Sequence, residues 1–445
     1  MSEFIPSSAE TQLAALQAFR RAAYDCLRQA QDALFELVDA ALLTPAVTAF
    51  AELSCAPVFR RRWPSLYEAL QDGRPARAAL LKLYVGLLPT QRLIVAGDHT
   101  AWSRLAAPTL RERTIEHQPT PVPGNRPITV GYGYSTLVGV PESRGSWALP
   151  LLHERITPAE TPIAKAVAQL AQLCKLLAVR PLSLWDSEYG CAPFILASAA
   201  IQADKLIRLR PNLCLWGPPP AYGGKGRPRE HGAKFKLSDA TTWGPPAEQL
   251  VVDDAELGRV EVALWRGVHL RKAKHHPLRL VRIHRPAAAD TRRARKDLWV
   301  AWHGEEPPPL AEWWRTYLRR FAVDHWYRFA KQRLHWTLPH LATPEQADRW
   351  SDLMPLMTWQ LWLARAVVAD NPLPWQKPQG AVALTPGRVC RGLGGVLAAI
   401  GTPTQAPKPR GKSPGWPKGR ERHPADATQS SKRPKRGPQQ GMVHE

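Results

Sequence analysis

The chain has 445 residues, 44% of them apolar, which is enough to bury a sizeable core and to carry further modules. Sixty Lys and Arg residues against 38 Asp and Glu residues give a formal charge of +22, which favours a polyanion such as nucleic acid as partner. A basic soluble protein without such a partner has the same balance, so charge alone does not decide. The six cysteines form no Cys-x-x-Cys pair, which argues against a zinc site and a disulfide framework. No window is apolar enough to span a membrane, and we expect a cytoplasmic protein without a membrane partner.

Helical periodicity dominates the first 90 residues. From about Ala9 to Leu88, apolar residues recur at spacings of three and four, which predicts an N-terminal helical domain over residues 1–90. Such helices either pack simply against one another or include a DNA-binding helix-turn-helix, and the sequence leaves both alternatives open.

Short apolar runs typical of buried strands begin at Leu93. The pattern predicts three strands, near 93–96, 128–134 and 147–152, and then a helix at 163–177, a strand at 181–185, a helix at 193–201 and a strand at 205–209. This βββαβαβ order is that of ribonuclease H. The predicted fold class is therefore α/β, with a ribonuclease-H-like catalytic core whose first part covers residues 91–210.

The rest of the chain divides into three segments. Gly, Pro and short strand-like runs predict a β-rich insertion over 211–304, and renewed helical periodicity predicts the C-terminal helical part of the core over 305–400. Residues 401–445 are rich in Pro, Lys and Arg and poor in aliphatic residues, which predicts a disordered basic tail.

A Gly-rich loop in the predicted insertion carries several cations, including Lys225, Arg227 and Arg229. A flexible loop of this kind can follow a DNA phosphate backbone, although an ordinary solvated loop has the same composition. Two tryptophans of the insertion, Trp216 and Trp243, are candidates for stacking on an unpaired base or for a buried aromatic core.

Two aspartates stand at the ends of predicted neighbouring strands. Asp98 follows Ile-Val-Ala-Gly where the first strand is expected to leave the sheet, and Asp186 follows Leu-Ser-Leu-Trp at the end of the fourth. Carboxylates at adjacent strand ends lie close enough to share a divalent metal ion, because Mg²⁺ prefers oxygen ligands. An aspartate at a strand end also serves commonly as a turn or helix-cap residue.

A third group of polar residues follows one predicted helical face. Tyr317, Arg320, Asp324 and Lys331 stand at offsets 0, 3, 7 and 14. Asp324 could complete a three-carboxylate site, with Tyr317, Arg320 and Lys331 donating hydrogen bonds to phosphate oxygens. An amphipathic helix with its charged face in solvent gives the same spacing.

This helix resembles the Tyr-x2-Arg-x3-Glu-x6-Lys signature of bacterial insertion-sequence DDE transposases. Tyr317, Arg320 and Lys331 match that spacing, whereas Asp324 stands where the family has Glu. Asp98 and Asp186 resemble the first two acidic members, and the predicted insertion precedes the third, as in that family. Glu188 and Glu312 are nearby carboxylates that lack the family's spacing.

The resemblance implies metal-dependent cleavage of double-stranded DNA at transposon ends, followed by strand transfer into target DNA. Two Mg²⁺ ions about 4 Å apart, replaceable by Mn²⁺, would be held by Asp98, Asp186 and Asp324. It further implies a homodimer on DNA and a nucleoid-associated location. The alternatives are a DNA-binding relative that has lost catalysis, which the shorter Asp324 favours, and a nuclease of the same fold that does not join DNA ends.

Overall fold

The computed structural model describes residues 9–122, 126–224, 226–286, 297–380 and 384–408, with the side chains of 117–126 outside the description. The helices and strands from Ala9 to Ile400 all belong to one compact unit, which extends to Gln405. No helix among these residues is long and apolar enough to cross a membrane. Most of the predicted basic tail, and Lys225 of the Gly-rich loop, lie outside the described residues.

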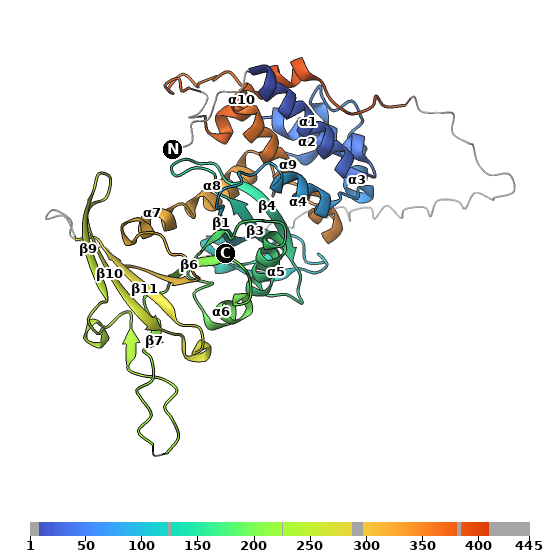
Figure 1. The fold of residues 1–445 in the computed structure, drawn as a ribbon. Helices are drawn as coiled ribbons and strands as arrows, with labels where there is room; N and C mark the ends of the chain where they lie inside the picture. Colours follow the sequence, from blue (N-terminus) through green and yellow to red (C-terminus); the bar gives the residue numbers. More distant parts are fainter. Residues whose placement is uncertain (1–8, 123–125, 225, 287–296, 381–383, 409–445) are drawn as a thin grey trace, which may run out of the picture. The chain divides into compact units, whose positions relative to one another are not determined.

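Helices from both ends of the chain pack together on one side of this unit (Figure 1). They are α1 (Ala9–Leu27), α2 (Gln31–Leu43), α3 (Pro64–Asp72), α4 (Arg77–Val85), α9 (Pro344–Ala364) and α10 (Pro386–Ile400), with the short η1 (Phe50–Cys55) between α2 and α3. Apolar residues at helical spacing form their common core, and a buried ion pair of 2.8 Å joins Arg20 of α1 to Asp39 of α2. A capping box starts α9, because Thr343 and Gln346 each accept the other's backbone N–H.

The core is a mixed α/β arrangement around one large sheet. Its central strands are β4 (Leu149–Ile156), β3 (Arg126–Gly139), β1 (Ile94–Ser103), β5 (Leu182–Trp185) and β6 (Asp204–Leu209), adjacent in that order. The first two pairings are antiparallel, and β1, β5 and β6 run parallel to one another. Short apolar runs produce these strands because both faces of the sheet are covered.

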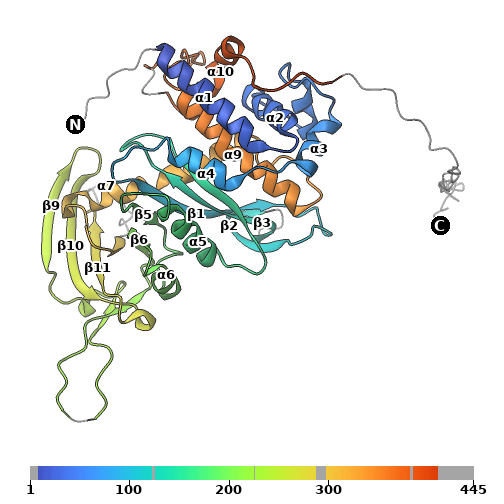
Figure 2. The ribbon, with the colours of Figure 1, turned by 45° about the vertical axis from the view of Figure 1, so that its right-hand side comes forward.

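Helices cover the two faces of this sheet, as alternate residues of β3 demonstrate. Ser135 hydrogen-bonds to Gln169 of α5 (Pro162–Cys174), whereas the neighbouring Tyr134 packs against Trp336 and reaches Asp348 of α9. Successive side chains of a strand point to opposite faces, so α5 and α9 lie on different sides. The short helix α6 (Ala192–Ser198) connects β5 to β6 and contacts α5 (Figure 2).

The structure contains a strand that the sequence pattern did not predict. Four strands precede α5 instead of three, because β2 (Thr114–Val122) pairs antiparallel with β3 at the edge of the sheet. Its sequence includes Pro119 and Pro121, which mask a strand signal, since proline removes a ladder donor and is tolerated chiefly in edge strands.

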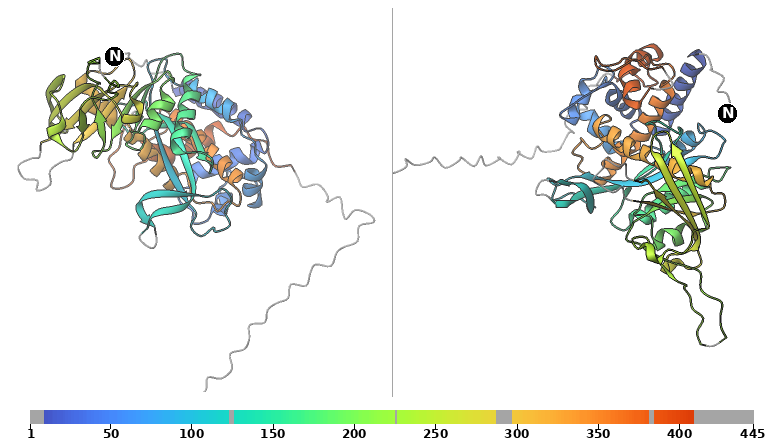
Figure 3. Two further views of the ribbon diagram at one scale, coloured as in Figure 1. Left: turned by 90° about the horizontal axis from the view of Figure 1, so that it is seen from below. Right: turned by 90° about the vertical axis from the view of Figure 1, so that its left-hand side faces the viewer.

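The β-rich segment extends the same sheet rather than forming a separate one. Antiparallel β12 (Leu298–His303) pairs with β6, and β11 (Leu278–His284), β10 (Gly258–Val268) and β9 (Glu248–Asp254) follow outward (Figure 3). A small hairpin of β7 (Cys214–Trp216) and β8 (Lys234–Lys236) lies beside it, with two single turns, η2 (Ala240–Thr242) and η3 (Arg271–Ala273). Phe235, Trp243, Trp265 and Trp299 pack into an aromatic cluster there.

The predicted helical face that carries Tyr317, Arg320, Asp324 and Lys331 is divided between two helices in the structure. After the turn η4 (Leu310–Glu312) come α7 (Trp313–Leu318) and α8 (Phe321–Gln332), with a break at Arg319 and Arg320. The backbone N–H groups of Arg320 and Ala322 bond to carbonyls three residues earlier, which tightens the chain at this point. The break turns Arg320 toward β1, as described next.

Candidate active site

Asp98 and Asp186 occupy equivalent positions on neighbouring parallel strands. The register pairs Gly97 of β1 with Trp185 of β5, so the two aspartates are the next residue along each strand. The prediction that Asp98 stands where its strand leaves the sheet was wrong in detail. Strand β1 continues to Ser103, paired with β3, and only its pairing with β5 ends at Gly97. Beyond Gly97 the two strands separate, and Asp98 and Asp186 are the first residues after their last paired positions.

Helix α8 brings the third acidic residue to these strands through Arg320. The guanidinium donates from Nη1 to Oδ2 of Asp98 at 3.2 Å and from Nη2 to Oδ2 of Asp324 at 3.3 Å. The Tyr327 hydroxyl donates to the backbone oxygen of Asp98 at 3.0 Å, and Lys331 Nζ donates to Thr100 Oγ1 at 2.8 Å. These contacts fasten α8 across β1, with Asp324 beside Asp98.

Burial and neighbouring acids disfavour the ionised form of Asp98. Burial raises the pKa of Asp98 to about 6, Arg320 partly offsets this rise, and Asp186 and Asp324 add to it. Burial would lower the pKa of Arg320, but Asp98, Tyr317, Asp324 and Asp186 together raise it well above its usual range. Within the described residues, the site therefore has more negative charge than one ion-paired arginine neutralises.

Three of the predicted phosphate-contacting residues are withdrawn from solvent, because Tyr317 and Arg320 are buried and Lys331 is partly buried. The pKa of Lys331 is lowered to about 8 by burial, against a smaller opposing effect of Asp98. The Tyr317 hydroxyl is buried and makes no hydrogen bond of good geometry in the described part of the chain, although the Arg320 guanidinium lies close enough to act on it. Its pKa is raised by burial, while Arg320 and Arg208 oppose that rise. Tyr317 and Arg208 thus belong to the same surroundings, although Arg208 carried no motif that would have identified it.

A second polar chain flanks the aspartates. His99 contacts Glu188 Oε2 through Nε2 and the Tyr189 hydroxyl through Nδ1, each at 3.3 Å, and Arg210 lies 4.0 Å from Glu188. Burial raises the pKa of Tyr189 well above its usual range, and Asp98 and Asp186 add to this effect. The sequence offered a weak signal for these residues, since His99 and Glu188 adjoin the aspartates.

The side chains at this site are of the kind that binds a metal ion, but they are not spaced closely enough to hold one. Carboxylates such as those of Asp98, Asp186 and Asp324 are the ligands that Mg²⁺ or Mn²⁺ prefers. Yet no three His, Cys, Asp or Glu side chains among the described residues lie close enough together to hold a metal ion. The guanidinium of Arg320, bonded to both Asp98 and Asp324, lies between two of the oxygens that such an ion would need.

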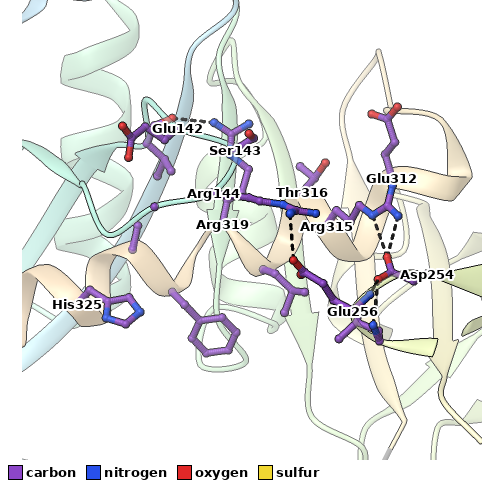
Figure 4. A pocket seen from close by; sticks show the side chains of 16 residues that line it. Glu142, Ser143, Arg144, Asp254, Glu256, Glu312, Arg315, Thr316, Arg319 and His325 are labelled. Atoms are coloured by element: carbon purple, nitrogen blue, oxygen red, sulfur yellow. Dashed lines mark hydrogen bonds and ion pairs between the residues drawn. The ribbon is translucent and has the colours of Figure 1, made fainter. Parts of the chain in front are cut away.

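A cavity of about 460 Å³ lies on the opposite side of α7 and α8 (Figure 4). Its lining comes from the segment after β3, from the turn between β9 and β10, and from α7 and α8. Arg315 pairs with Asp254 at 2.8 Å and Arg144 pairs with Glu256 at 3.0 Å. Because these pairs join different segments, the cavity wall is a junction between the inserted strands and the core.

The predicted cationic loop lies apart from the aspartates, between β7 and β8, and projects away from α8 (Figure 1). Arg227 and Arg229 are exposed, and Arg227 pairs with Glu230 at 3.1 Å. The structure thus brings Arg320, Asp324 and Asp98 together and leaves Arg227 and Arg229 on a separate surface.

A mixed α/β sheet with an acid-rich edge is the arrangement expected of a nuclease. Residues 22–271, more than half of the chain, match the family model of the DDE superfamily endonucleases, and the chain belongs to this family. No curated protein is similar enough to match. Family membership implies a DNA substrate and divalent-metal chemistry. The matched region includes Asp98 and Asp186 and ends before Asp324, whose assignment depends on its position in the structure.

Proposed function

We propose that this protein is a DNA transposase that cleaves DNA at transposon ends with two Mg²⁺ ions and joins the freed ends to target DNA. Its core is ribonuclease-H-like, an assignment supported by the strand order β4-β3-β1-β5-β6. The catalytic set is Asp98, Asp186 and Asp324. The proposed parts are an N-terminal domain (1–90), a core in two parts (91–210 and 305–400), a β-rich insertion between these parts (211–304) and a basic tail (401–445).

One observation carries the proposal. Asp98 and Asp186 follow paired positions on the adjacent strands β1 and β5, and Arg320 bonds to both Asp98 and Asp324 of α8. Carboxylates from three elements thus lie near one another, and Asp186 and Asp324 both raise the pKa of Asp98. Structural aspartates elsewhere in the described chain commonly have their own base, as Asp39 has Arg20. A surplus of buried negative charge costs stability, and such strain is typical of a functional site.

The chain's own residues have separable tasks in the proposed reaction. Bound metal ions would supply charge neutralisation on the phosphate and activation of the attacking oxygen. Asp98 and Asp186 on the rigid sheet edge fix where a scissile phosphate must lie. Tyr317 and Arg320 offer an O–H and N–H donors to its oxygens, and Lys331 holds α8 against β1 at Thr100 and Ala101.

A catalytically inactive DNA-binding relative is the second candidate, and one observation favours it. Asp324 stands where the resembling family has Glu and is one methylene shorter, and its carboxylate already pairs with Arg320. A nuclease that cuts without joining ends is distinguished from a transposase by its products. Two transposon ends held together would require a homodimer on DNA.

The test is cleavage of a DNA fragment that carries the element's ends, in Mg²⁺ and in Mn²⁺. We expect metal-dependent nicking at the ends by the parent, and none by Asp98→Ala or Asp186→Ala. Asp72→Ala, an exposed aspartate on α3, is the matched control and should cleave like the parent. DNA binding without cleavage in either metal would contradict the proposal and favour the inactive relative.

A further inference from the structure

Arg320 occupies a position where a metal ion would compete for its carboxylate partners and a phosphate group would compete for its guanidinium. Its two terminal nitrogens are divided between Asp98 and Asp324, one bond to each, and its side chain is only 8% exposed. The oxygens it contacts are Oδ2 of each carboxylate. Divalent ions bind carboxylate oxygens of this kind, so Arg320 and a metal ion compete for the same atoms.

The same side chain also has unused capacity for a phosphate. Its Nε is buried and makes no hydrogen bond of good geometry in the described part of the chain, and neither does the hydroxyl of Tyr317, which lies near the same guanidinium. Leaving a buried donor without a well-placed acceptor costs free energy, which an incoming phosphate oxygen would recover. A guanidinium presents its donors in a flat fork that matches the oxygens of a phosphate.

We propose that Arg320 is an exchangeable internal counter-ion, which holds the carboxylates of Asp98 and Asp324 until a DNA phosphate takes its guanidinium and frees them for metal. This inference rests on the proposed function and adds its regulation. Before exchange, one Arg320 cation is shared by two carboxylates, which leaves a net negative charge at the site. After exchange, Arg320 would pair with a phosphate and a divalent metal ion would pair with the two carboxylates, so that the charges would be compensated more fully.

A thermodynamic consequence follows from this exchange. If DNA removes Arg320 from the carboxylates, DNA binding must raise metal affinity, and metal binding must raise DNA affinity by the same factor. The protein alone would then bind metal weakly, and the complete site would form only on DNA. Such coupling would keep a nuclease from assembling its metal site in the absence of its substrate.

The experiment measures Mn²⁺ binding to the full chain by calorimetry, without DNA. We expect Arg320→Gln to bind Mn²⁺ roughly tenfold more tightly than the parent, because two charge-assisted hydrogen bonds no longer compete. Arg320→Lys should fall between them, since an ammonium keeps the charge but lacks the fork that spans both carboxylates. Arg208→Gln is the matched control, because Arg208 is exposed and influences Tyr317 without an ion pair to either carboxylate among the described contacts. It should change Mn²⁺ affinity by less than about twofold, as an exposed charge is screened.

A second measurement adds short duplex DNA. Parent affinity for Mn²⁺ should rise on DNA, and the rise should be much smaller in Arg320→Gln, whose carboxylates are already free. Equal or weaker Mn²⁺ binding by Arg320→Gln than by the parent, or an equal gain from Arg208→Gln, would overturn the counter-ion role while leaving the proposed transposase intact. Failure of every variant to bind Mn²⁺, with or without DNA, would overturn both.

Discussion

Acidic residues on the two sides of the α7–α8 segment are paired with cations in different ways. On the cavity side, Asp254 pairs with Arg315 and Glu256 pairs with Arg144, so each acid has a base from another segment. On the strand side, Asp98 and Asp324 share Arg320, and no cation in the described residues pairs with Asp186. Acidic residues that each have their own cation stabilise the contact between two segments. Acidic residues that share one cation retain a net negative charge, which favours the binding of a further cation.

The pKa directions follow the same division. Backbone N–H groups of Leu257 and Glu256, together with Arg315, hold the pKa of Asp254 well below its usual range. Burial and neighbouring acids move the pKa of Asp98 the other way, to about 6. The ionised form is therefore favoured at Asp254 in the cavity wall and disfavoured at Asp98, where burial outweighs the effect of the shared arginine.

The largest expected effect comes from Asp98→Asn, which removes one shared acid. Cleavage should fall by about 1,000-fold or more if Asp98 is a metal ligand, an activation loss of about 4 kcal/mol. Stability in a chelator should increase instead. The folded pKa of about 6 lies above the unfolded value of about 3.9, so ionised Asp98 opposes folding increasingly from pH 4 to pH 6 and fully above it.

The stability gain of Asp98→Asn should be about 3 kcal/mol at pH 8, from a pKa about two units above the unfolded value, and should largely vanish near pH 4. Denaturant unfolding in a chelator at both pH values measures it. A variant that is less stable than the parent at pH 8 would contradict the view that the ionised form of this carboxylate destabilises the folded protein.

Asp324→Glu should increase the rate of cleavage about tenfold, because the added methylene extends the carboxylate from α8 toward β1. Initial rates on a DNA fragment with the element's ends measure the effect. Asp324→Asn, which keeps the length and removes the charge, is the control and should slow cleavage. A Glu variant slower than the parent would mean that the backbone of α8 already lies at the distance an aspartate requires.

Asp254→Ala tests the cavity side of the comparison. The change leaves Arg315 without its acid and two backbone N–H groups in the β9–β10 turn without an acceptor. We expect a lower thermal midpoint, with unchanged Mn²⁺ affinity of the folded protein. A change in Mn²⁺ affinity as large as that of Asp98→Asn would break the distinction between the two sides.

Arg144→Ala should have the smallest effect. Both partners of its pair with Glu256 are largely exposed, at 79% and 64%, and such pairs contribute about 0–1 kcal/mol. Denaturant unfolding in low and high salt is the measurement. A loss above about 2 kcal/mol would show that this pair is far more strongly coupled to the junction than its exposure suggests.

Elements with a strong local pattern were predictable from sequence. Apolar runs before Asp98 and Asp186 identified two buried strands, and the observed register puts these residues at matching positions directly after the last pair of β1 and β5, although β1 itself continues to Ser103. The edge strand β2 was missed because prolines obscure its pattern, and the break between α7 and α8 was missed because the helical periodicity continues through it.

What sequence could not supply is the partner of each charge. Spacing placed Arg320 and Asp324 on one helical face, four residues apart, but the bond from Arg320 to Asp98 crosses 222 positions and depends on how α8 packs over β1. The pairing of Asp254 with Arg315 likewise joins β9 to α7. Long-range packing thus decides which acids have partners, and that difference distinguishes the candidate site from an ordinary salt-bridged surface.

The continuous hydrogen-bond ladder from β5 through β6 and β12 to β9 also fixes the distance between the candidate site and the outer strand of the sheet. Five inter-strand steps of about 4.8 Å separate the strand that ends at Asp186 from the outer edge of the sheet, a span of about 24 Å. On B-form DNA, at 3.4 Å per base pair, this corresponds to about seven base pairs. Any contact that the outermost strand makes with a duplex would lie at a set number of base pairs from the cut, because backbone bonds rather than a hinge fix the separation.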